Sequence, residues 1–493
     1  MNATHLPVLQ VVIPLISAPI CVLLRRDRVA WAFTLIVSWV VLAVAVLLLD
    51  RVMEQGTLSY AIGGWAAPWG IEYRVDATSA FVLLIIAIIG SVVLPFAHTS
   101  VAHEIPRDRI YLFYTCYLLC LTGLLGITIT GDAFNLFVFL EISSLSSYVL
   151  ISLGRDRRAL TAAFQYLIMG TIGATFILIG VGLLYMTTGT LNMADLAQRL
   201  PAVSSSRTVI AAFAFITVGA SLKLALFPLH LWLPNAYTFA PSVVSAFLAA
   251  TATKVGVYVL FRFFFTVFGV EFSFGVMRAG EMLLVLALVA TLVASTVAVF
   301  QEDIKRMLAY SSVAQIGYMI LGASLATVSG VTAGVIHLFN HALIKGGLFL
   351  ALGCIFLRIG SVHIRDMEGI AKTMPLTMAA FVVGGLSLIG VPLTSGFISK
   401  WYLVQATLEQ GQWIVAVLIL VSSLIAVAYV WRVIEAAYFR SPSPRARDAT
   451  EAPPVMLVST WILIGANLYF GIDTSLTSTV ARRAAETLLG LGT

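Results

Sequence analysis

Charged residues are scarce in this sequence. Only 11% of its 493 residues are Asp, Glu, Lys or Arg, whereas 60% are hydrophobic. Because a soluble domain averages about 25% charged residues, the composition argues against a soluble domain, and the net charge of +6 is better explained by membrane topology than by nucleic-acid binding. Apolar runs of about 20 residues recur along the chain, each long enough to cross a bilayer. The composition is that of an integral membrane protein.

Signals for cofactors, nucleotides and secretion are also missing. The four cysteines lie in or beside apolar segments, where we expect them to pack as small hydrophobic side chains: Cys21, Cys116, Cys120 and Cys354. No Cys-x-x-Cys, Walker A or Rossmann glycine pattern occurs, so we expect no cofactor, no nucleotide and no metal site. The first basic residues follow the N-terminal apolar run, which is the wrong polarity for a cleavable signal peptide.

The apolar windows predict an all-α polytopic membrane protein with fourteen transmembrane spans. The basic residues alternate between the loops, with 17 in odd-numbered loops and 8 in even-numbered loops and tails. Because basic loops stay in the cytoplasm, this alternation predicts that both termini lie on the outer side of a bacterial cell membrane. The predicted spans are residues 6–24, 29–49, 78–98, 110–130, 132–153, 159–186, 208–230, 243–267, 282–300, 307–326, 330–357, 375–400, 411–431 and 455–472.

Proline interrupts two of these spans. Pro228 lies in the seventh span, Pro234 follows shortly after its end, and Pro392 lies in the twelfth, so neither span is expected to form one continuous helix. Each also contains a lysine, and paired interrupted spans of this kind hold ion sites in transporters built from internal repeats. The two spans lie five helices apart, which indicates five-helix repeats. An odd number of helices per repeat places the two units in opposite membrane orientations.

Ionisable residues inside the predicted spans are few. A charge at the centre of a bilayer costs a few kcal/mol, so such groups usually face the protein interior and serve a function. His337, His341 and Lys345 recur at intervals of four and therefore share one helix face. Buried lysines and histidines can be poised to exchange protons near neutral pH. These groups predict a lateral proton path. The path also includes Glu141, which pairs with Lys223, and the two further lysines Lys254 and Lys400.

Structural roles compete with this interpretation at single positions. Lys400 lies near the end of its predicted helix and can snorkel to the membrane surface. Lys254 can bind a free backbone carbonyl at a helix break, and His337 can bridge two helices. His230 is equally compatible with a relay role and with capping the carbonyls freed by the neighbouring proline. We expect Asp132 to cap the N-terminus of the fifth span.

Three segments resemble the antiporter-like subunits shared by respiratory complex I, membrane-bound hydrogenases and Mrp-type cation/proton antiporters. They are TGDAFNLFVFLEISSLSSYVLISLG, SLKLALFPLHLWLPNAYTFAPSVVSAFLAATATKVGVY and HLFNHALIKGGLFL. The resemblance covers essentially the whole chain. It implies two inverted five-helix repeats with broken seventh and twelfth helices. The division that follows is residues 1–109 for the first three helices, 110–267 and 282–438 for the repeats, and 439–493 for a cytoplasmic loop end and the last helix.

The resemblance also implies a role for each buried group along a proton relay. Glu141 and Lys223 would form the coupling ion pair, and Lys254 would be the next relay lysine. His337, His341 and Lys345 would form the central bridge, and Lys400 would be the terminal proton-exchanging residue.

Within this family the sequence looks most like the D subunits of Mrp-type antiporters. The chain stops soon after its last span, and Lys400 stands where one complex I subunit of similar length has a glutamate. We therefore expect a proton-translocating subunit that works with other membrane subunits to exchange Na⁺ for protons. The alternative is a proton-pumping subunit, without its own redox centre, of an NADH–quinone oxidoreductase or a hydrogenase. A third hypothesis is a scaffold that merely retains the charges.

Overall fold

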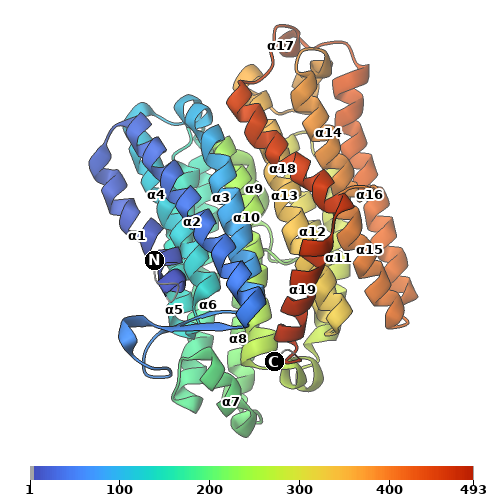
Figure 1. Ribbon diagram of the computed structural model, residues 1–493. Coiled ribbons are helices and arrows are strands. Elements are labelled where there is room, and N and C mark those ends of the chain that lie inside the picture. The colour runs from blue at the N-terminus through green and yellow to red at the C-terminus, as the bar shows by residue number, and fades with distance from the viewer. Residues whose placement is uncertain (1–4, 492–493) are drawn as a thin grey trace.

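The computed structural model describes residues 5–491, and this part of the chain is almost entirely helical (Figure 1). Most helices run between two ends of the molecule. One end carries an antiparallel hairpin of β1 (Leu58–Ala61) and β2 (Glu72–Val75). The opposite end carries the short helix α17 (Pro444–Arg447). We call them the hairpin end and the α17 end.

The N-terminal half of the chain forms ten α-helices and two π-helical segments. Their bounds are α1 (Leu6–Leu24), α2 (Asp27–Gln55), α3 (Ala77–Glu104), α4 (Ile110–Ile129), α5 (Ala133–Ser152), α6 (Arg158–Thr188), α7 (Met193–Val203), α8 (Arg207–Leu224), α9 (Trp232–Phe239), α10 (Ser242–Phe261), η4 (Arg262–Val267) and η5 (Glu271–Val276).

The remaining long helices follow in the C-terminal half, and short 3₁₀ turns connect some of the elements. The long helices are α11 (Ala279–Val299), α12 (Ile304–Ser324), α13 (Val328–Ile359), α14 (Pro375–Ile389), α15 (Ser395–Glu409), α16 (Trp413–Phe439), α18 (Pro454–Ile472) and α19 (Ser475–Leu488). The 3₁₀ turns are η2 (Ile62–Gly64), η3 (Arg107–Arg109), η6 (Ile364–Met367) and η7 (Ile370–Lys372).

The prediction of an all-α polytopic membrane protein is confirmed. Within residues 5–491, 12 helices are long and apolar enough to cross a membrane, or 13 if a bent pair that includes α14 counts as one span. Two of the fourteen predicted spans differ from this set. The tenth is α12, whose first turn contains Lys305 and Arg306 and which is rich in polar residues. The twelfth is divided into α14 and α15, and 15 residues are too few for either to cross alone.

Both predicted helix breaks are present. Pro228 lies between α8 and α9, and Pro392 lies between α14 and α15. The prediction that Pro234 also breaks a helix is wrong, because Pro234 is the third residue of α9, where the first turn tolerates proline. The chain turns at each break through a residue with positive φ, namely Ala225 (φ 60) and Gly390 (φ 93).

Several elements carry no apolar signal and were not predicted. The hairpin and α7 lie between predicted spans, and α17 lies in the proline-containing segment before α18. α19 follows α18 after a short break and packs against α13 and α3. Residues 439–493 therefore contain more structure than the single helix expected there.

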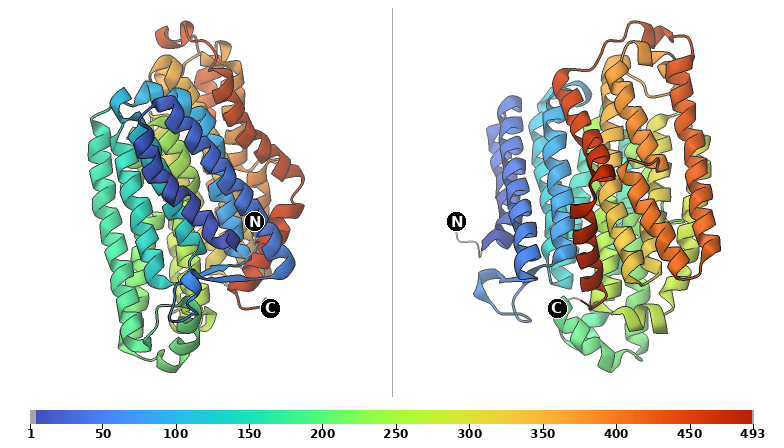
Figure 2. Two further views of the ribbon diagram at one scale, coloured as in Figure 1. Left: turned by 60° about the vertical axis from the view of Figure 1, so that its left-hand side comes forward. Right: turned by 45° about the vertical axis from the view of Figure 1, so that its right-hand side comes forward.

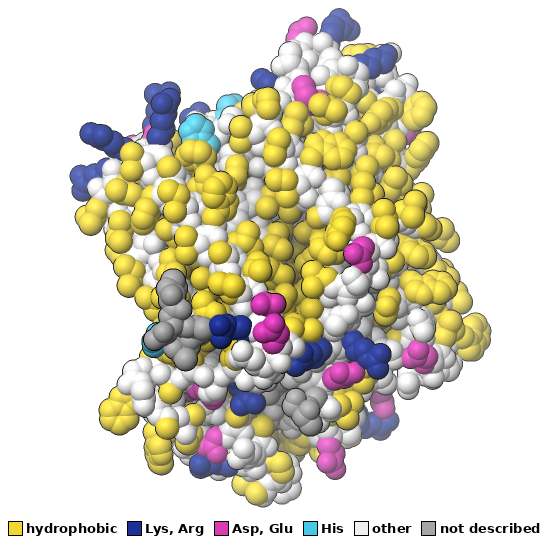
Figure 3. Space-filling model, in the orientation of Figure 1, with side chains coloured by type: hydrophobic (Ala, Val, Ile, Leu, Met, Phe, Trp, Pro, Cys, Tyr) yellow, Lys and Arg dark blue, Asp and Glu magenta, His cyan; other side chains and the backbone are white. Residues whose placement is uncertain are grey.

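The surface and the interior divide the hydrophobic residues between them. Large exposed hydrophobic side chains are spread over α2, α6, α16 and α18. On the face drawn in Figure 3, hydrophobic side chains form a broad band, and most of the charged side chains lie toward the two ends of the molecule. α13 lies at the centre of the C-terminal half and contacts α10, α12, α15 and α18. Glycine permits the close approach of α12, since a Cβ on Gly334 would lie 3.0 Å from the Met319 carbonyl oxygen.

The two described chain ends lie toward the hairpin end (Figure 2). The His5 ring bonds to the Tyr60 hydroxyl of β1 at 3.2 Å. Near the other terminus, the Thr78 hydroxyl at the start of α3 donates to the Ala484 carbonyl of α19 at 3.3 Å. If the long axis of the bundle spans the membrane, the chain crosses the membrane an even number of times between these two chain ends.

Candidate functional site

The predicted relay residues lie on α13 and on four helices that pack around it or next to its neighbours. Glu141 belongs to α5, Lys223 to α8 and Lys254 to α10, whereas Lys400 belongs to α15. The remaining three lie on α13. All except the partly buried Glu141 are buried, and His341 and Lys345 have no exposed surface.

Lys223 contacts α5 through a serine. Its Nζ donates to the Ser144 Oγ at 2.7 Å. Glu141 lies one turn earlier on α5, and within residues 5–491 it makes no ion pair with Lys223 and its buried Oε1 has no hydrogen-bond partner. Ser144 therefore occupies the position at which the direct ion pair was expected. A cavity of about 30 Å³ beside Lys223, also lined by Ser143 and Ser147, has room for a water molecule.

The central lysines bind backbone carbonyls. The Lys345 Nζ donates to the Leu308 carbonyl of α12 at 2.7 Å and to the Ser311 hydroxyl. The Lys254 Nζ donates to the Ala249 carbonyl at 2.5 Å, five residues earlier on its own helix. Lys254 therefore does not serve a helix break, which was its alternative role.

The two histidines of α13 are arranged in parallel. The rings of His337 and His341 stack with centroids 5.9 Å apart and an interplanar angle of 5°. Neither ring nitrogen of His341 has a protein partner within residues 5–491. The Nδ1 of His337 bonds to the Ser399 Oγ at 2.8 Å, which links α13 to α15 at the residue before Lys400.

Lys400 turns into the break between α14 and α15. Its Nζ donates to the carbonyls of Leu388 and Ile389 at 3.0 and 2.8 Å and to the Ser423 hydroxyl at 3.0 Å. A cation at the C-terminus of a helix is stabilised by the helix dipole. The structure does not support the snorkelling alternative, because Lys400 is the sixth residue of α15, is buried, and bonds to groups inside the protein.

The hydroxyl groups that accompany these cations were not predicted from the sequence. The Tyr318 ring lies 5.1 Å from the Lys400 Nζ and meets the His337 ring at 5.5 Å, while its hydroxyl donates to Ser422 at 2.8 Å. The serine-rich run EISSLSSY of α5 was a usable signal for Ser144. Isolated residues such as Ser399 offered none.

The two remaining predicted residues occupy helix termini. The Asp132 side chain accepts a hydrogen bond from the Asn135 amide at 2.7 Å, so its prediction as the N-cap of α5 is confirmed. His230 lies in the break after α8, with its ring stacked on Phe227 at 5.2 Å. The Leu222 carbonyl at the end of α8 accepts hydrogen bonds from the Trp232 indole at 3.0 Å and from the Ala225 amide at 3.3 Å, and a relay role for His230 stays a prediction.

Two basic residues assigned to loops are in fact buried. Arg262 is 7% exposed and Lys305 is 4% exposed. The error arises because both lie where a helix begins or changes its winding, which charge counting does not detect. The Lys305 Nζ donates to the Ala240 carbonyl at 3.2 Å.

Lys305 lines a charged cleft of about 310 Å³ at the α17 end, together with Glu104, Asp156 and Asp303. The hydrogen bond from Arg158 holds the pKa of the Asp156 carboxyl below its usual range. Asp156 therefore stays negatively charged beside the positively charged Arg158, and the cleft is lined by both signs of charge. Leu308 and Ser311, to which the Lys345 ammonium donates, follow Lys305 along α12 by about one and two helical turns. The cleft therefore approaches the buried groups from the α17 end.

These features define a polytopic helical membrane protein with ionisable side chains buried between its helices, a combination that marks ion-translocating proteins. Residues 130–426 match the family described as NADH:quinone oxidoreductase/Mrp antiporter, TM. The chain belongs to this family.

Relatives of two kinds are similar over nearly the full length. The chain is 45% identical to the N subunit of the NADH-quinone oxidoreductase of Desulforudis audaxviator over 91% of this chain and 90% of the relative. It is 29% identical to the D subunit of the Na⁺/H⁺ antiporter of Bacillus subtilis over 98% and 97%.

Solved structures give the same picture. A chain of the Mrp complex from a Dietzia species superposes with a TM-score of 0.91 at 26% identity, covering 99% of this chain and 98% of that one. A chain of the archaeal membrane-bound sulfane sulfur reductase gives 0.90 at 31% identity, covering 98% of both. A chain of respiratory complex I from Thermus thermophilus gives 0.77 at 25% identity, covering 97% and 99%.

Proposed function

We propose that this chain is the proton-translocating subunit of a multisubunit Mrp-type Na⁺/H⁺ antiporter. The observation that carries the proposal is the set of four buried lysines, Lys223, Lys254, Lys345 and Lys400, each bonded to a hydroxyl or carbonyl oxygen. Burying such groups is costly, and neutral oxygen partners leave a lysine free to release its proton. The histidines of α13 lie between the central and terminal lysines.

The relay runs laterally across the bundle. Lys223 marks its start, where Glu141 lies one turn of α5 from the serine that Lys223 contacts. Lys254 lies on α10, which packs directly against α13, the helix of His341 and Lys345. The contact of His337 with Ser399 continues the series to Lys400. Water and hydroxyl groups close the remaining gaps.

The proposed topology places the hairpin end and both termini outside and the α17 end in the bacterial cytoplasm. The basic loops predict this orientation, and chain ends on one side fit an even number of crossings. We also infer two inverted repeats, because α8 with α9 and α14 with α15 are interrupted in the same manner. Fourteen crossings result if α12 and the α14–α15 pair each count once.

The assignment to an antiporter rests on the similarity to the antiporter chain of Bacillus subtilis and to the Mrp complex, whose superposition exceeds that of complex I. The partners are then other membrane subunits, and the transported ions are protons and Na⁺.

The test is cation-driven exchange in everted membrane vesicles that contain the complex. Glu141→Ala and Lys223→Ala should each abolish the Na⁺-driven pH change, whereas Lys372→Ala, at an exposed lysine of η7, should leave it intact. Immunoblots of the partner subunits establish that each variant assembles. Full exchange by an assembled Lys223→Ala complex would refute the relay.

A second candidate is a proton-pumping subunit of a redox complex. The 45% identity to an NADH-quinone oxidoreductase subunit favours it, as does the similarity to the sulfane sulfur reductase chain. The chain's role would remain proton translocation, and its partners would contain the redox centres. Purification of the intact complex separates the candidates, because iron–sulfur or flavin absorbance identifies a redox complex and a set of small membrane subunits without it identifies an antiporter.

A further inference from the structure

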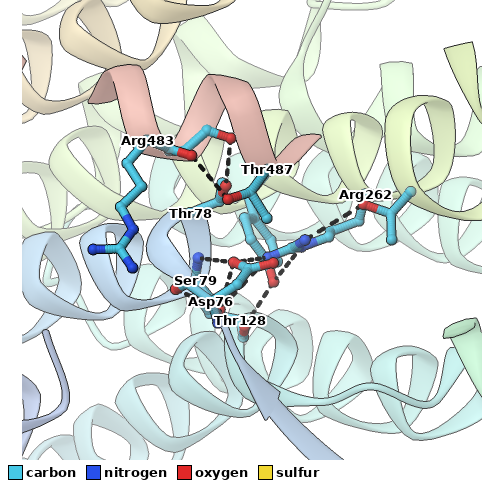
Figure 4. Close-up of polar contacts among 10 residues, drawn as sticks. Asp76, Thr78, Ser79, Thr128, Arg262, Arg483 and Thr487 are labelled. Carbon is cyan, nitrogen blue, oxygen red and sulfur yellow. Dashed lines mark hydrogen bonds and ion pairs between the residues drawn. The ribbon is translucent and has the colours of Figure 1, made fainter. Parts of the chain in front are cut away.

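A buried ion pair closes the hairpin end of the bundle. Arg262, the first residue of η4, donates through Nη2 to the Oδ1 of Asp76, and the two side chains are only 8% and 7% exposed. Asp76 is also the N-cap of α3 and accepts the Ser79 amide and hydroxyl at 3.0 Å each. Figure 4 shows these groups converging beneath α19. The pair thus joins α3 to the end of α10.

A tyrosine extends this contact toward the bundle interior. The Arg262 Nε donates to the Tyr258 hydroxyl at 2.8 Å, and that hydroxyl donates to the Thr128 carbonyl at 2.7 Å (Figure 4). The guanidinium also lies 5.0 Å from the centroid of the Tyr258 ring. The Tyr258 hydroxyl is therefore engaged both as a donor and as an acceptor.

The same face of α10 carries Lys254. Lys254, Tyr258 and Arg262 recur at intervals of four, so they follow one another along the helix with about 6 Å of rise per step. All three are buried, with exposed fractions of 1%, 2% and 7%. A line of polar side chains thus leads from the central lysine toward the hairpin end, and it ends at Asp76.

The chemistry of this line prevents proton passage. A guanidinium does not deprotonate in proteins, so Arg262 cannot accept a proton from Tyr258 and hand it on. A backbone carbonyl accepts a hydrogen bond but has no proton to release, so Thr128 is also a dead end. The fixed positive charge of Arg262 further repels protons and cations, as arginine does in selective pores. Burial raises the pKa of Asp76, but the Arg262 guanidinium and the Ser79 donors outweigh it and hold that pKa below its usual range.

We propose that Tyr258, Arg262 and Asp76 form a proton-blocking plug that seals Lys254 from the hairpin end, so that protons move laterally toward α13 instead of leaving the first half of the bundle. This inference rests on the proposed relay, in which Lys254 exchanges protons. A purely structural tie between α3 and α10 would use the same contacts, so the tests must report proton leak and not only stability.

The key variants replace the guanidinium with a group that can release a proton. Arg262→Lys retains the positive charge beside Asp76 and is the variant most compatible with folding, whereas Arg262→His titrates near neutral pH. The measurement is the decay of an imposed pH gradient across vesicles that contain the assembled complex, without a transported cation. We expect a several-fold faster decay in both variants than in the parent complex.

Two controls isolate the cause. Arg199→His alters the exposed Arg199–Asp195 pair of α7 and should not change the leak. The double variant Arg262→Met with Asp76→Leu replaces the plug with apolar groups and should remain tight. Adding Lys254→Met to Arg262→Lys should return the leak to the parent level, because the leak is expected to pass through Lys254.

Three results would overturn the plug: an assembled Arg262→Lys complex that is as tight as the parent, a leak in the apolar double variant, or a leak that survives Lys254→Met. Loss of exchange in Lys223→Ala together with a tight Arg262→Lys complex would refute the plug alone. Full exchange in Lys223→Ala would refute the relay itself.

Discussion

At the scale of single residues, the buried lysines are unusual in having neutral partners. Lys223 bonds to a serine, Lys345 to a serine and a carbonyl, and Lys400 to a serine and two carbonyls. A carboxylate in contact would hold a lysine in its charged form. Neutral oxygens solvate the ammonium without fixing its proton, which suits a group that must alternate between two protonation states.

Ser144 provides a direct test of this idea. Ser144→Ala removes the only hydrogen-bond partner of the Lys223 ammonium within residues 5–491. An unsatisfied buried charge costs about 1–3 kcal/mol or more, so we expect the rate of Na⁺-driven exchange to fall by about tenfold, measured in the vesicle assay. Ser146→Ala is the matched control, since in the described part of the chain the buried Ser146 hydroxyl bonds only to the Ile142 carbonyl of its own helix. Equal rates in the two variants would show that Ser144 has no role beyond packing.

At the scale of helices, the breaks explain what sequence patterns predict well and what they do not. Proline marked the breaks near Pro228 and Pro392 because it removes a backbone donor and blocks the preceding turn. Hydropathy placed Lys400 near the end of a span that in fact restarts as α15 and continues to Glu409. The partner of Lys223 depends on how α5 rotates against α8, and no one-dimensional pattern contains that information.

Gly396 maintains the second break. A Cβ at this position of α15 would collide with the backbone carbonyl of Ser387 in α14, so Gly396→Ala must push the two helices apart. Such overpacking costs about 1–3 kcal/mol. It should also draw Lys400, one turn further along α15, away from the carbonyls that end α14. We expect less assembled complex and slower exchange per complex.

Gly465→Ala in α18 is the control for this prediction, because a Cβ there would meet nothing within 4 Å. The amount of complex is measured by immunoblot and its thermal stability in detergent by size-exclusion chromatography after heating. Normal stability and exchange in Gly396→Ala would mean that the contact between α14 and α15 is looser than the structure has it.

At the scale of the whole molecule, the buried charges do not balance. Asp76 neutralises Arg262, and Glu104 and Asp303 line the cleft beside Lys305. Within residues 5–491, however, none of the four lysines of the proposed relay forms an ion pair with a carboxylate. Four charged ammonium groups without a paired carboxylate would be costly in a low-dielectric interior. In the proposed relay, most of the lysines are therefore neutral at any moment, and a proton that enters the series can occupy one of several vacant sites. Translocation becomes the movement of a few charges through many acceptors.

This charge imbalance predicts that function and stability oppose each other at Lys254. Within residues 5–491, its Nζ hydrogen-bonds only to the Ala249 carbonyl of its own helix, and methionine has a similar length and packs readily in apolar surroundings. Replacing a buried ionic group with a well-packed apolar one is often neutral or stabilising by about 1–4 kcal/mol. Lys254→Met should therefore abolish Na⁺-driven exchange while the purified complex melts at the same or a higher temperature than the parent. Lys372→Met, at an exposed lysine, should change neither quantity. If Lys254→Met destabilised the complex, the lysine would be a structural element of α10, and if exchange persisted, protons would bypass it; each outcome removes Lys254 from the relay.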